Sequence, residues 1–428
     1  MSEHRTDRQE IPGQSGLLPG IPRQAGPAGP PVPPPGPPAP LPGFTAQLGA
    51  AVLAGLRAFT GSPPLARHQA AVVRIGLALV VLLQFLREWP HRRELYGDRA
   101  AWSLPLARAL QDQTHAFSVL SWQDGRWWFE AWYALALLAA MLLLLGWRTR
   151  FSSVLFLVAV LSLQNRSVLL GDGGDNLVHL LALYLAFTRC TEVWSLDARR
   201  RARGGRPGTS GVLLWVLGGA ALVWAEAAGR ISWSAPGWPG PGWAALFWTL
   251  WAVAGAWWAV NHWWPLGEPR AVLDALGAMV HHCAVAVIGA QVVLVYATAG
   301  LYKVQGSRWQ DGTALYYPLH LDYFTPWPGL SGLLAGSSLL VFLLTYGTVL
   351  VQVAFPFTLL NRRLKNGLLV LMVLEHLGIA VLLGLPLFSL AMIAADAVFL
   401  PTGLLLWAGR TVRGRLAGWR SVRVEQPA

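Results

Sequence analysis

The chain has few charged residues for its length. Only 13% of its 428 residues are Asp, Glu, Lys or Arg, whereas 54% are apolar, and the mean hydropathy is +0.44. Soluble domains usually carry about 25% charged residues, so the composition excludes an ordinary soluble domain. Apolar surface on this scale must face lipid as well as a protein core.

Cysteine is nearly absent. The two cysteines, Cys190 and Cys283, fall on different predicted helices, so we expect no disulfide between them. No Cys and His residues show the spacing of a zinc site, and the sequence predicts no metal centre. The formal net charge of +12 comes without a nucleic-acid-binding motif, so nucleic acid is not an expected partner.

Lysine is scarce as well. Of the 33 basic residues, only Lys303 and Lys365 are lysines. Arginine cannot lose its proton in a protein, whereas a desolvated lysine can. Lys303 follows a long apolar run in YATAGLYKVQGSRWQDGTALYY (296–317) and could therefore act as a base. The structural alternative is a lysine that only extends its ammonium group toward the membrane surface.

Near-continuous apolar runs recur along the chain, and about 20 such residues span the hydrocarbon of a bilayer. They predict an all-α, polytopic membrane helix bundle of about ten transmembrane helices. The segment 104–121 is too polar for a span and predicts a re-entrant or interfacial helix. The predicted spans lie near residues 70–87, 127–146, 150–166, 176–194, 211–228, 243–262, 272–300, 335–360, 366–384 and 386–408.

The ends of the chain differ in composition from its middle. Residues 1–64 are polar and then proline-rich, which predicts a disordered tail and lead-in because such a segment cannot bury enough apolar surface to fold. Residues 65–409 form the predicted membrane domain, and 410–428 a basic cytoplasmic tail. Tryptophans gather at 230–264, which is typical of an aromatic belt at the membrane interface.

The distribution of basic residues predicts the orientation. With the N-terminus inside, 22 of the 33 lysines and arginines fall on the cytoplasmic side and 10 on the outer side, while Arg74 lies within a helix. This bias predicts that both termini are cytoplasmic in the plasma membrane of a bacterium. Lys303 and the loop 170–179 then lie toward the outer face. In the turn LLGWRTRF, Arg148 and Arg150 are predicted to serve orientation alone.

Ionisable residues inside membrane helices are costly and usually functional. Glu375 and His376 are adjacent in the apolar stretch LLVLMVLEHLGIAVLLG, so both must point into the bundle and find partners. The pair is either functional or a buried structural pair, and Asp396 in the last predicted helix is the expected partner.

The remaining polar candidates lie in loops. In LGDGGDNLVH (170–179), Asp175 can cap the following helix; alternatively, Asp172 or Asp175 lines an outward cavity and acts on a substrate or on Lys303. The loop ELYGDRAAW (94–102) is predicted to be solvated. The predicted wall of a substrate or cofactor cavity comprises Asp172, Asp175, Asn176, Tyr302, Trp309, Asp311, Glu375 and Asp396.

Four segments together resemble a known family. They are RIGLALVVLLQFLREWPHRRELYGD, LLGWRTRFSSVLFLVAVLSLQNRSVLLGDGGDNL, YATAGLYKVQGSRWQDGTALYY and EHLGIAVLLGLPLFSLAMIAADAVFLP. They resemble the HTTM (horizontally transferred transmembrane) domain over residues 65–405. That family includes the membrane domain of vitamin K-dependent γ-glutamyl carboxylase and SdpB-type bacterial proteins that mature secreted peptide toxins. The most specific pieces are AG-x-x-K…W-x-x-G and the helix segment beginning at Glu375-His376.

The resemblance implies roles for particular residues. Lys303 matches the lysine that deprotonates the quinol, which here would be menaquinol or a vitamin K-type hydroquinone, and His376 matches a histidine of the penultimate membrane helix. In the carboxylase, quinol oxidation drives removal of a glutamate proton so that CO₂ can add. The resemblance also implies that 205–262 is a Trp-rich insertion. The carboxylase continues into a lumenal domain that grips its substrate, so we expect the membrane domain or a partner protein to bind substrate here.

Two functions therefore remain open. One is a quinol-dependent, carboxylase-like enzyme or enzyme subunit that modifies an exported peptide at the outer face of the membrane. The other is a non-catalytic membrane partner, such as an immunity, export or assembly factor, of a secreted peptide system. A transporter would be favoured by an inverted repeat, and the sequence shows none.

Overall fold

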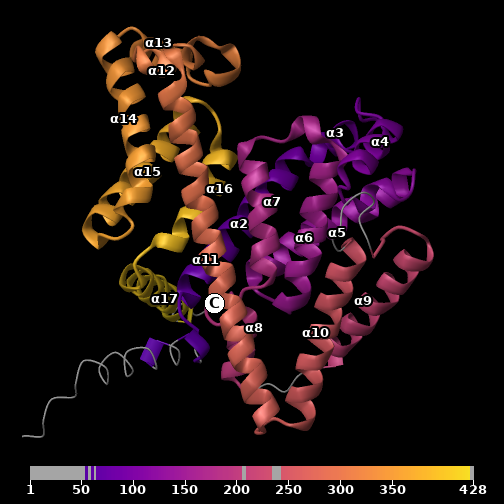
Figure 1. The fold of residues 1–428 in the computed structure, drawn as a ribbon. Coiled ribbons are helices and arrows are strands. Elements are labelled where there is room, and N and C mark those ends of the chain that lie inside the picture. Colours follow the sequence, from indigo (N-terminus) through magenta and orange to yellow (C-terminus); the bar gives the residue numbers. More distant parts are fainter. Residues whose placement is uncertain (1–53, 56–58, 62–63, 205–208, 234–241, 425–428) are drawn as a thin grey trace, which may run out of the picture. The chain divides into compact units, whose positions relative to one another are not determined.

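The computed structural model describes residues 54–55, 59–61, 64–204, 209–233 and 242–424, with side chains up to residue 415. These residues belong to one compact unit, Val52–Ala428. The predicted disordered tail lies almost wholly outside the described residues, so its disorder stays a prediction. Every regular element within the described part is helical (Figure 1), which confirms the all-α fold class.

Seven helical stretches in the described residues are long and apolar enough to cross a membrane, and a bent pair of helices could form an eighth. The chain is therefore an integral membrane protein by the length and composition of its helices. The seven are Arg67–Leu95, which contains α2 (Arg67–Glu88), then α5 (Arg126–Leu145), α9 (Thr209–Ala227), α10 (Trp243–Trp263), α11 (Glu268–Gln305), α14 (Ser338–Thr358) and α15 (Arg362–Leu382).

Two other predicted spans form helices that are shorter or more polar. Helix α6 (Thr149–Arg166) covers 18 residues with polar residues at both ends, and α7 (Gly173–Ala186) covers 14. At 1.5 Å per residue, α7 is about 21 Å long, less than the hydrocarbon thickness of about 30 Å. Helix α4 (Leu104–Thr114), in the segment predicted to lack a span, has only 11 residues.

The predicted span over 386–408 is not one unbroken helix but a bent pair of helices. Helix α16 (Pro386–Asp396) continues through η7 (Ala397–Phe399), and then the chain bends by 116° into α17 (Thr402–Val424). Leu400 is extended, with φ −64° and ψ 138°. Pro401 explains the break, because proline lacks an N–H and disfavours helical geometry in the residue before it.

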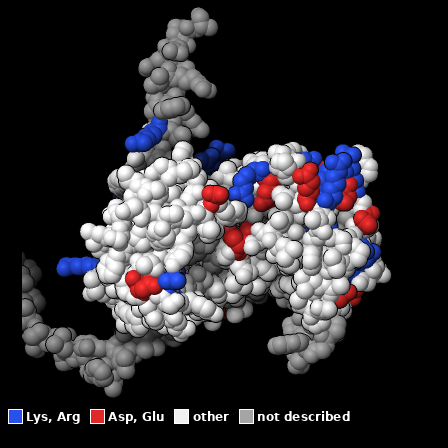
Figure 2. Space-filling view, turned by 90° about the horizontal axis from the view of Figure 1, so that it is seen from above, with Lys and Arg blue, Asp and Glu red and all other residues white. Residues whose placement is uncertain are grey.

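Short elements complete the chain. They are α3 (Arg92–Leu95), α8 (Leu196–Ala202), α12 (Ser307–Gln310), α13 (Pro328–Ala335), η1 (Trp89–His91), η2 (Val119–Ser121), η3 (Val168–Leu170), η4 (Ala314–Tyr316), η5 (Pro318–His320) and η6 (Asp322–Phe324). Seen from above (Figure 2), basic and acidic side chains lie next to one another and wide areas carry neither. The loop 94–102, predicted to be solvated, contributes to ion pairs, of which Arg93–Asp98 at 2.6 Å is one.

Helix α16 joins two groups of packed helices. It contacts α2 and α7 on one side and α11 and α15 on the other, while α2 packs on α5 and α11 packs on α14. Gly76 of α2 lies against Ala394 of α16, where a Cβ would come within 2.5 Å of the alanine Cβ. Small residues at such crossings let membrane helices approach closely. This close approach seats α16 against α2, and α16 also contacts α11 and α15.

The Trp-rich region holds α9 and α10 to each other. The indole rings of Trp215 and Trp251 stack at 4.2 Å, and each Nε1–H donates to the other residue's carbonyl oxygen at 2.9 Å. Gly219 and Gly255 make room, since a Cβ at either would lie 2.8 Å from the opposing indole. Trp251, which the sequence assigns to an aromatic belt, therefore also packs between helices.

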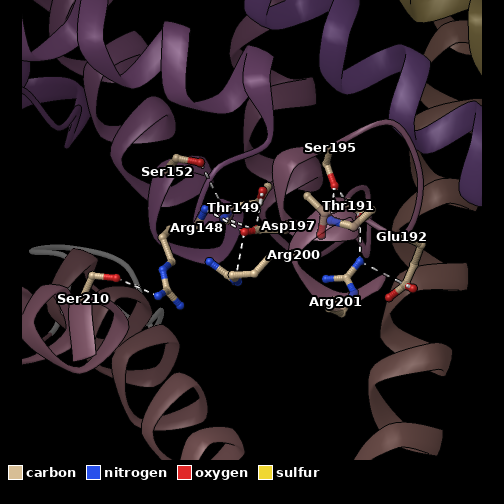
Figure 3. Close-up of polar contacts among 11 residues, drawn as sticks. Arg148, Thr149, Ser152, Thr191, Glu192, Ser195, Asp197, Arg200, Arg201 and Ser210 are labelled. Carbon is tan, nitrogen blue, oxygen red and sulfur yellow. Dashed lines mark hydrogen bonds and ion pairs between the residues drawn. The ribbon is translucent and has the colours of Figure 1, made fainter. Parts of the chain in front are cut away.

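Hydrogen bonds hold the turn between α5 and α6 from two sides, and Figure 3 shows the side formed by Asp197. The buried Asp197 carboxylate accepts from the backbone N–H groups of Arg148 and Thr149, at 3.1 and 3.0 Å, and pairs with Arg200 at 3.0 Å. The fully buried Arg74 of α2 donates to the carbonyls of Leu143 and Leu144 at the end of α5. The turn predicted to serve orientation alone is thus also a packing junction.

Replacing Asp197 by alanine should destabilise the folded protein by about 1–3 kcal/mol, because the first turn of α6 loses its cap and buried N–H groups lose their acceptor. Thermal unfolding in detergent, followed by circular dichroism, measures the effect. The matched control is Asp112→Ala on the exposed face of α4, which should leave the midpoint within about 1 °C. Equal midpoints for the two variants would contradict this account of the turn.

Candidate functional site

Lys303 lies at one end of a chain of polar side chains that crosses three helices. Its Nζ, in the last turn of α11, donates to Oε1 of Gln352 on α14 at 2.8 Å. Nε2 of Gln352 in turn donates to Oε1 of Glu375 on α15. Because an ammonium group can only donate, the Gln352 amide must present its oxygen to Lys303 and its nitrogen to Glu375. Lys303 and Glu375 are thereby coupled through a neutral group.

A second polar chain centres on Tyr296, seven residues before Lys303 on α11. The Tyr296 hydroxyl donates to Oδ2 of Asp396 at 3.0 Å and lies 2.9 Å from Nε2 of His376. Since a hydroxyl has one proton to give, the Nε2–H of His376 donates to the tyrosine oxygen. All three residues are at most 2% exposed. The predicted pairing of His376 with Asp396 is therefore indirect and runs through Tyr296.

Three buried atoms of these chains lack a hydrogen-bond partner among the described residues. They are Oε2 of Glu375, Nδ1 of His376 and Oδ1 of Asp396. Buried polar atoms are nearly always paired in folded proteins. Glu375 and His376 are adjacent on α15, so the two polar chains meet there. We call Lys303, Gln352, Glu375, Tyr296, His376 and Asp396 the polar centre; its free acceptor atoms could receive a proton or bind a ligand hydroxyl.

Aromatic side chains surround the polar centre. The ring of Phe355 lies 5.7 Å from that of Tyr296, and the ring of Phe388 lies 5.7 Å from that of His376. Phe399 packs on Phe355 with ring centroids 5.3 Å apart. In such apolar surroundings, charges and hydrogen bonds interact more strongly than in water.

The residues of the AG-x-x-K and W-x-x-G block have distinct structural tasks. Gly300 lets α11 approach α14, since a Cβ there would lie 2.8 Å from Val353, and this approach sets Lys303 beside Gln352. The Trp309 ring centroid lies 5.2 Å from Nζ of Lys303, within reach of a cation–π interaction. Gly312 has φ +77°, a left-handed conformation that favours glycine.

Asp311 and Tyr302 lie away from the polar centre. Asp311 is exposed; its carboxylate accepts from the hydroxyl and N–H of Thr313 and pairs with Arg308 at 3.4 Å. The Thr313 hydroxyl, helped by its N–H and by Arg308, lowers the pKa of Asp311 below its usual range. Asp311 thus stabilises its own loop. The Tyr302 side chain is 81% exposed.

The loop before α7 is a capping box. Oδ1 of Asp172 accepts from the N–H groups of Gly174 and Asp175, at 2.7 and 3.0 Å, and the Asp175 carboxylate accepts from the Asp172 N–H. Asp175 also accepts from Nε2 of Gln84 on α2 at 3.0 Å. The capping alternative is therefore present, and Asn176 is exposed beside it. Among the residues described, no contact joins this loop to Lys303.

Gly174 connects the loop before α7 to the polar centre only indirectly, through Phe388. A Cβ on Gly174 would lie 3.1 Å from Cα of Phe388, so the start of α7 packs against α16. The ring of Phe388 then separates the capping box from His376. Of the predicted site residues, the structure brings together Lys303, Trp309, Glu375, His376 and Asp396.

Sequence reasoning did not single out two members of the polar centre. Gln352 is the only amide in the apolar helix SLLVFLLTYGTVLVQVAFPFT, which is the signal that could have identified it. Tyr296 lies two helical turns before Lys303 and hence on the same helix face. No group of three or more His, Cys, Asp or Glu residues in the described part of the chain could hold a metal ion.

The polar centre joins ionisable groups of α11, α15 and α16, of which Tyr296, His376 and Asp396 are buried and Lys303 and Glu375 are half-buried. Its geometry suits proton transfer, because it combines a lysine, two carboxyl groups, an imidazole and a phenol within hydrogen-bonded chains. In comparisons with known proteins, the chain matches no family model, no curated protein and no solved structure.

Proposed function

We propose that this chain is an HTTM-type membrane enzyme, or enzyme subunit, that uses a quinol to modify an exported peptide. The observation that supports this most strongly is the polar centre itself. Lys303 is joined by a neutral amide to Glu375, and His376 and Asp396 flank Tyr296. Placing ionisable groups among apolar membrane helices costs several kilocalories per mole, and such groups are usually retained for function.

Lys303 would act as the general base. Its hydrogen-bond partner is an uncharged amide, so no carboxylate within hydrogen-bond distance holds it in the protonated form. The neutral amine can then take a proton from a substrate hydroxyl. The ammonium that forms is stabilised by Oε1 of Gln352, by the negative charge of Glu375 beyond it and by the face of Trp309.

His376 and Tyr296 would hold and move a second proton. The Nδ1 of His376 is free to accept one, and its Nε2–H already donates to Tyr296. If that proton moves to Tyr296 and the tyrosine proton moves to Asp396, one proton is passed from His376 to Asp396. Proton transfer from His376 toward Asp396 fits the hydrogen bond in which the Tyr296 hydroxyl donates to Asp396 at 3.0 Å.

The resemblance implies a quinol as cofactor, either menaquinol or a vitamin K-type hydroquinone. Bound at the polar centre, it would provide reducing equivalents. The residues present fit it. Lys303 and the three unpartnered acceptor atoms match a ligand that carries hydroxyl groups, and Phe355, Phe388 and Phe399 offer apolar surface to its ring and tail. The isoprenoid tail of a quinol partitions into the bilayer.

We further propose about ten spans in a bacterial plasma membrane, with both termini cytoplasmic and Lys303 toward the outer side. The eight candidates together with α6 and α7, which pack against each other, would make up that number. The excess of basic residues on one side supports the orientation. Residues 205–262 would be an insertion, and an exported peptide and a partner protein would complete the system.

Solvent extraction of the purified protein, followed by mass spectrometry of the extract, tests the cofactor. We expect quinone at close to one molecule per chain, and only traces in a control membrane protein purified from the same membranes. Absence of quinone above that background would contradict the enzyme proposal. It would favour the second candidate, a non-catalytic immunity, export or assembly factor, which should also tolerate Lys303→Arg.

A further inference from the structure

Three arginines surround one tryptophan ring at the ends of α6, α10 and α11. The guanidinium carbons of Arg150, Arg189 and Arg270 lie 4.1, 5.3 and 5.8 Å from the ring centroid of Trp257. Each distance is within the range of a cation–π interaction. Three positive charges around one ring repel one another, so the arrangement needs a source of negative charge.

The acidic residues near the three arginines supply only part of the negative charge that this arrangement needs. Asp274 pairs with both Arg189 and Arg270, at 3.2 and 2.7 Å. Glu192 pairs with Arg201 at 3.8 Å. Arg150 is exposed, and its guanidinium group, which lies over the Trp257 ring, takes part in no ion pair or hydrogen bond within the described residues. The group formed by Arg150, Arg189, Arg270 and Trp257, which we call the arginine cluster, therefore keeps an excess of positive charge.

The surrounding structure holds the arginine cluster in place. Figure 3 shows Asp197 of α8 beside the start of α6, where it caps the turn that carries Arg148. Arg148 in turn donates to the hydroxyl of Ser210, at 2.6 Å. Arg150 is the second residue of that capped helix. Arg189 donates to the carbonyl of Asp274 at 3.0 Å, and a Cβ at Gly277 would lie 2.6 Å from its guanidinium.

The position of the arginine cluster matches the headgroup layer of a bilayer. Arg150 and Arg270 lie in the first turns of α6 and α11, and Trp257 lies near the end of α10. Arginine and tryptophan at helix ends are typical of that layer. The guanidinium group binds phosphate oxygens with two parallel hydrogen bonds, which makes it the preferred phosphate-binding side chain.

We infer that the arginine cluster binds a phosphate group, as carried by an anionic lipid headgroup or by a soluble phosphate ester. Arg150 would contribute donors that no protein group uses, while Arg189 and Arg270 add positive charge. Trp257 would order the guanidinium groups and extend apolar surface toward the acyl chains of a lipid. This site is separate from the polar centre and does not depend on the function proposed for it.

Native mass spectrometry of the full-length protein in detergent tests the inference with phosphatidylglycerol as the anionic lipid and phosphatidylcholine as the zwitterionic control. We expect preferential binding of phosphatidylglycerol. Arg150→Gln should weaken it about fivefold, the loss expected for about 1 kcal/mol of headgroup attraction per arginine. Arg199→Gln, which removes one charge from the exposed face of α8, is the matched control and should change binding less than about twofold.

Competition with glycerol 3-phosphate identifies the source of the phosphate. Displacement of phosphatidylglycerol by this soluble ester assigns the site to a soluble phosphate compound, and failure to displace it assigns the site to the lipid. Arg270→Gln is measured in parallel and should give the same loss as Arg150→Gln, which guards against a folding defect in either variant. Unchanged phosphatidylglycerol binding in both variants, or an equal loss with Arg199→Gln, would overturn the inference.

Discussion

Replacing Lys303 by arginine is expected to lower quinol oxidation by the purified protein at least about 100-fold, the usual contribution of a general base. Arginine keeps the positive charge and can still reach Gln352, but it does not release its proton. The loss would therefore report the missing base and not a missing charge. Oxidation of a short-chain quinol, followed by absorbance, measures it in detergent.

The matched control is the only other lysine in the chain. Lys365 lies in the first turn of α15 and donates to the carbonyl of Phe399, a contact that an arginine can also make. Lys365→Arg should keep activity within about twofold of wild type. Equal activity of wild type and Lys303→Arg, with both proteins folded, would remove Lys303 from any catalytic role.

Replacing Tyr296 by phenylalanine should both destabilise the protein and impair the reaction. The variant leaves Nε2 of His376 and Oδ2 of Asp396 buried without their shared partner, at a cost of about 1–3 kcal/mol for each group. It also interrupts the only hydrogen-bonded path between the two residues among the contacts described. We expect a lower thermal midpoint and a reduced rate of quinol oxidation.

Tyr302→Phe provides the comparison for Tyr296→Phe. Tyr302 lies on the same helix, six residues further on, and its side chain is 81% exposed. Its hydroxyl makes no contact with the polar centre, so the midpoint and the rate should both stay at wild-type values. If Tyr296→Phe behaved like Tyr302→Phe, the tyrosine would be a packing residue and not a bridge between His376 and Asp396.

Hydropathy predicts most of this fold because lipid requires long, uniformly apolar helices. Each predicted span overlaps a helix in the structure, yet the pattern does not reveal where a helix stops inside apolar sequence. Pro401 breaks the segment 386–408, although its neighbours are as apolar as those of an unbroken span. The 14-residue length of α7 depends likewise on loop contacts rather than on hydropathy.

The candidate site is predictable where ionisable residues stand out against an apolar background. Lys303, Glu375, His376 and Asp396 are visible in this way, and the structure brings them together. Tyr296 does not stand out in this way because its side chain is uncharged. Charge alone does not identify a site residue, because the charged Asp172 and Asp175 cap α7.

The distances between these residues depend on helix crossings that the sequence does not specify. Gly76 against Ala394, and Gly300 against Val353, allow two such close approaches. Either glycine could be read from the sequence alone as a loop or a kink. Only the packed helices show that Gly300 sets Lys303 beside Gln352.

Mass spectrometry of the peptides secreted by cells that carry wild-type protein or Lys303→Ala tests the central claim most directly. We expect at least one secreted peptide to differ in mass between the two strains, with the modified form present only with the wild type and with Lys365→Arg. The mass difference would identify the reaction, since addition of CO₂ and other modifications differ in mass. Identical secreted peptides, with both proteins present in the membrane at equal levels, would contradict the account.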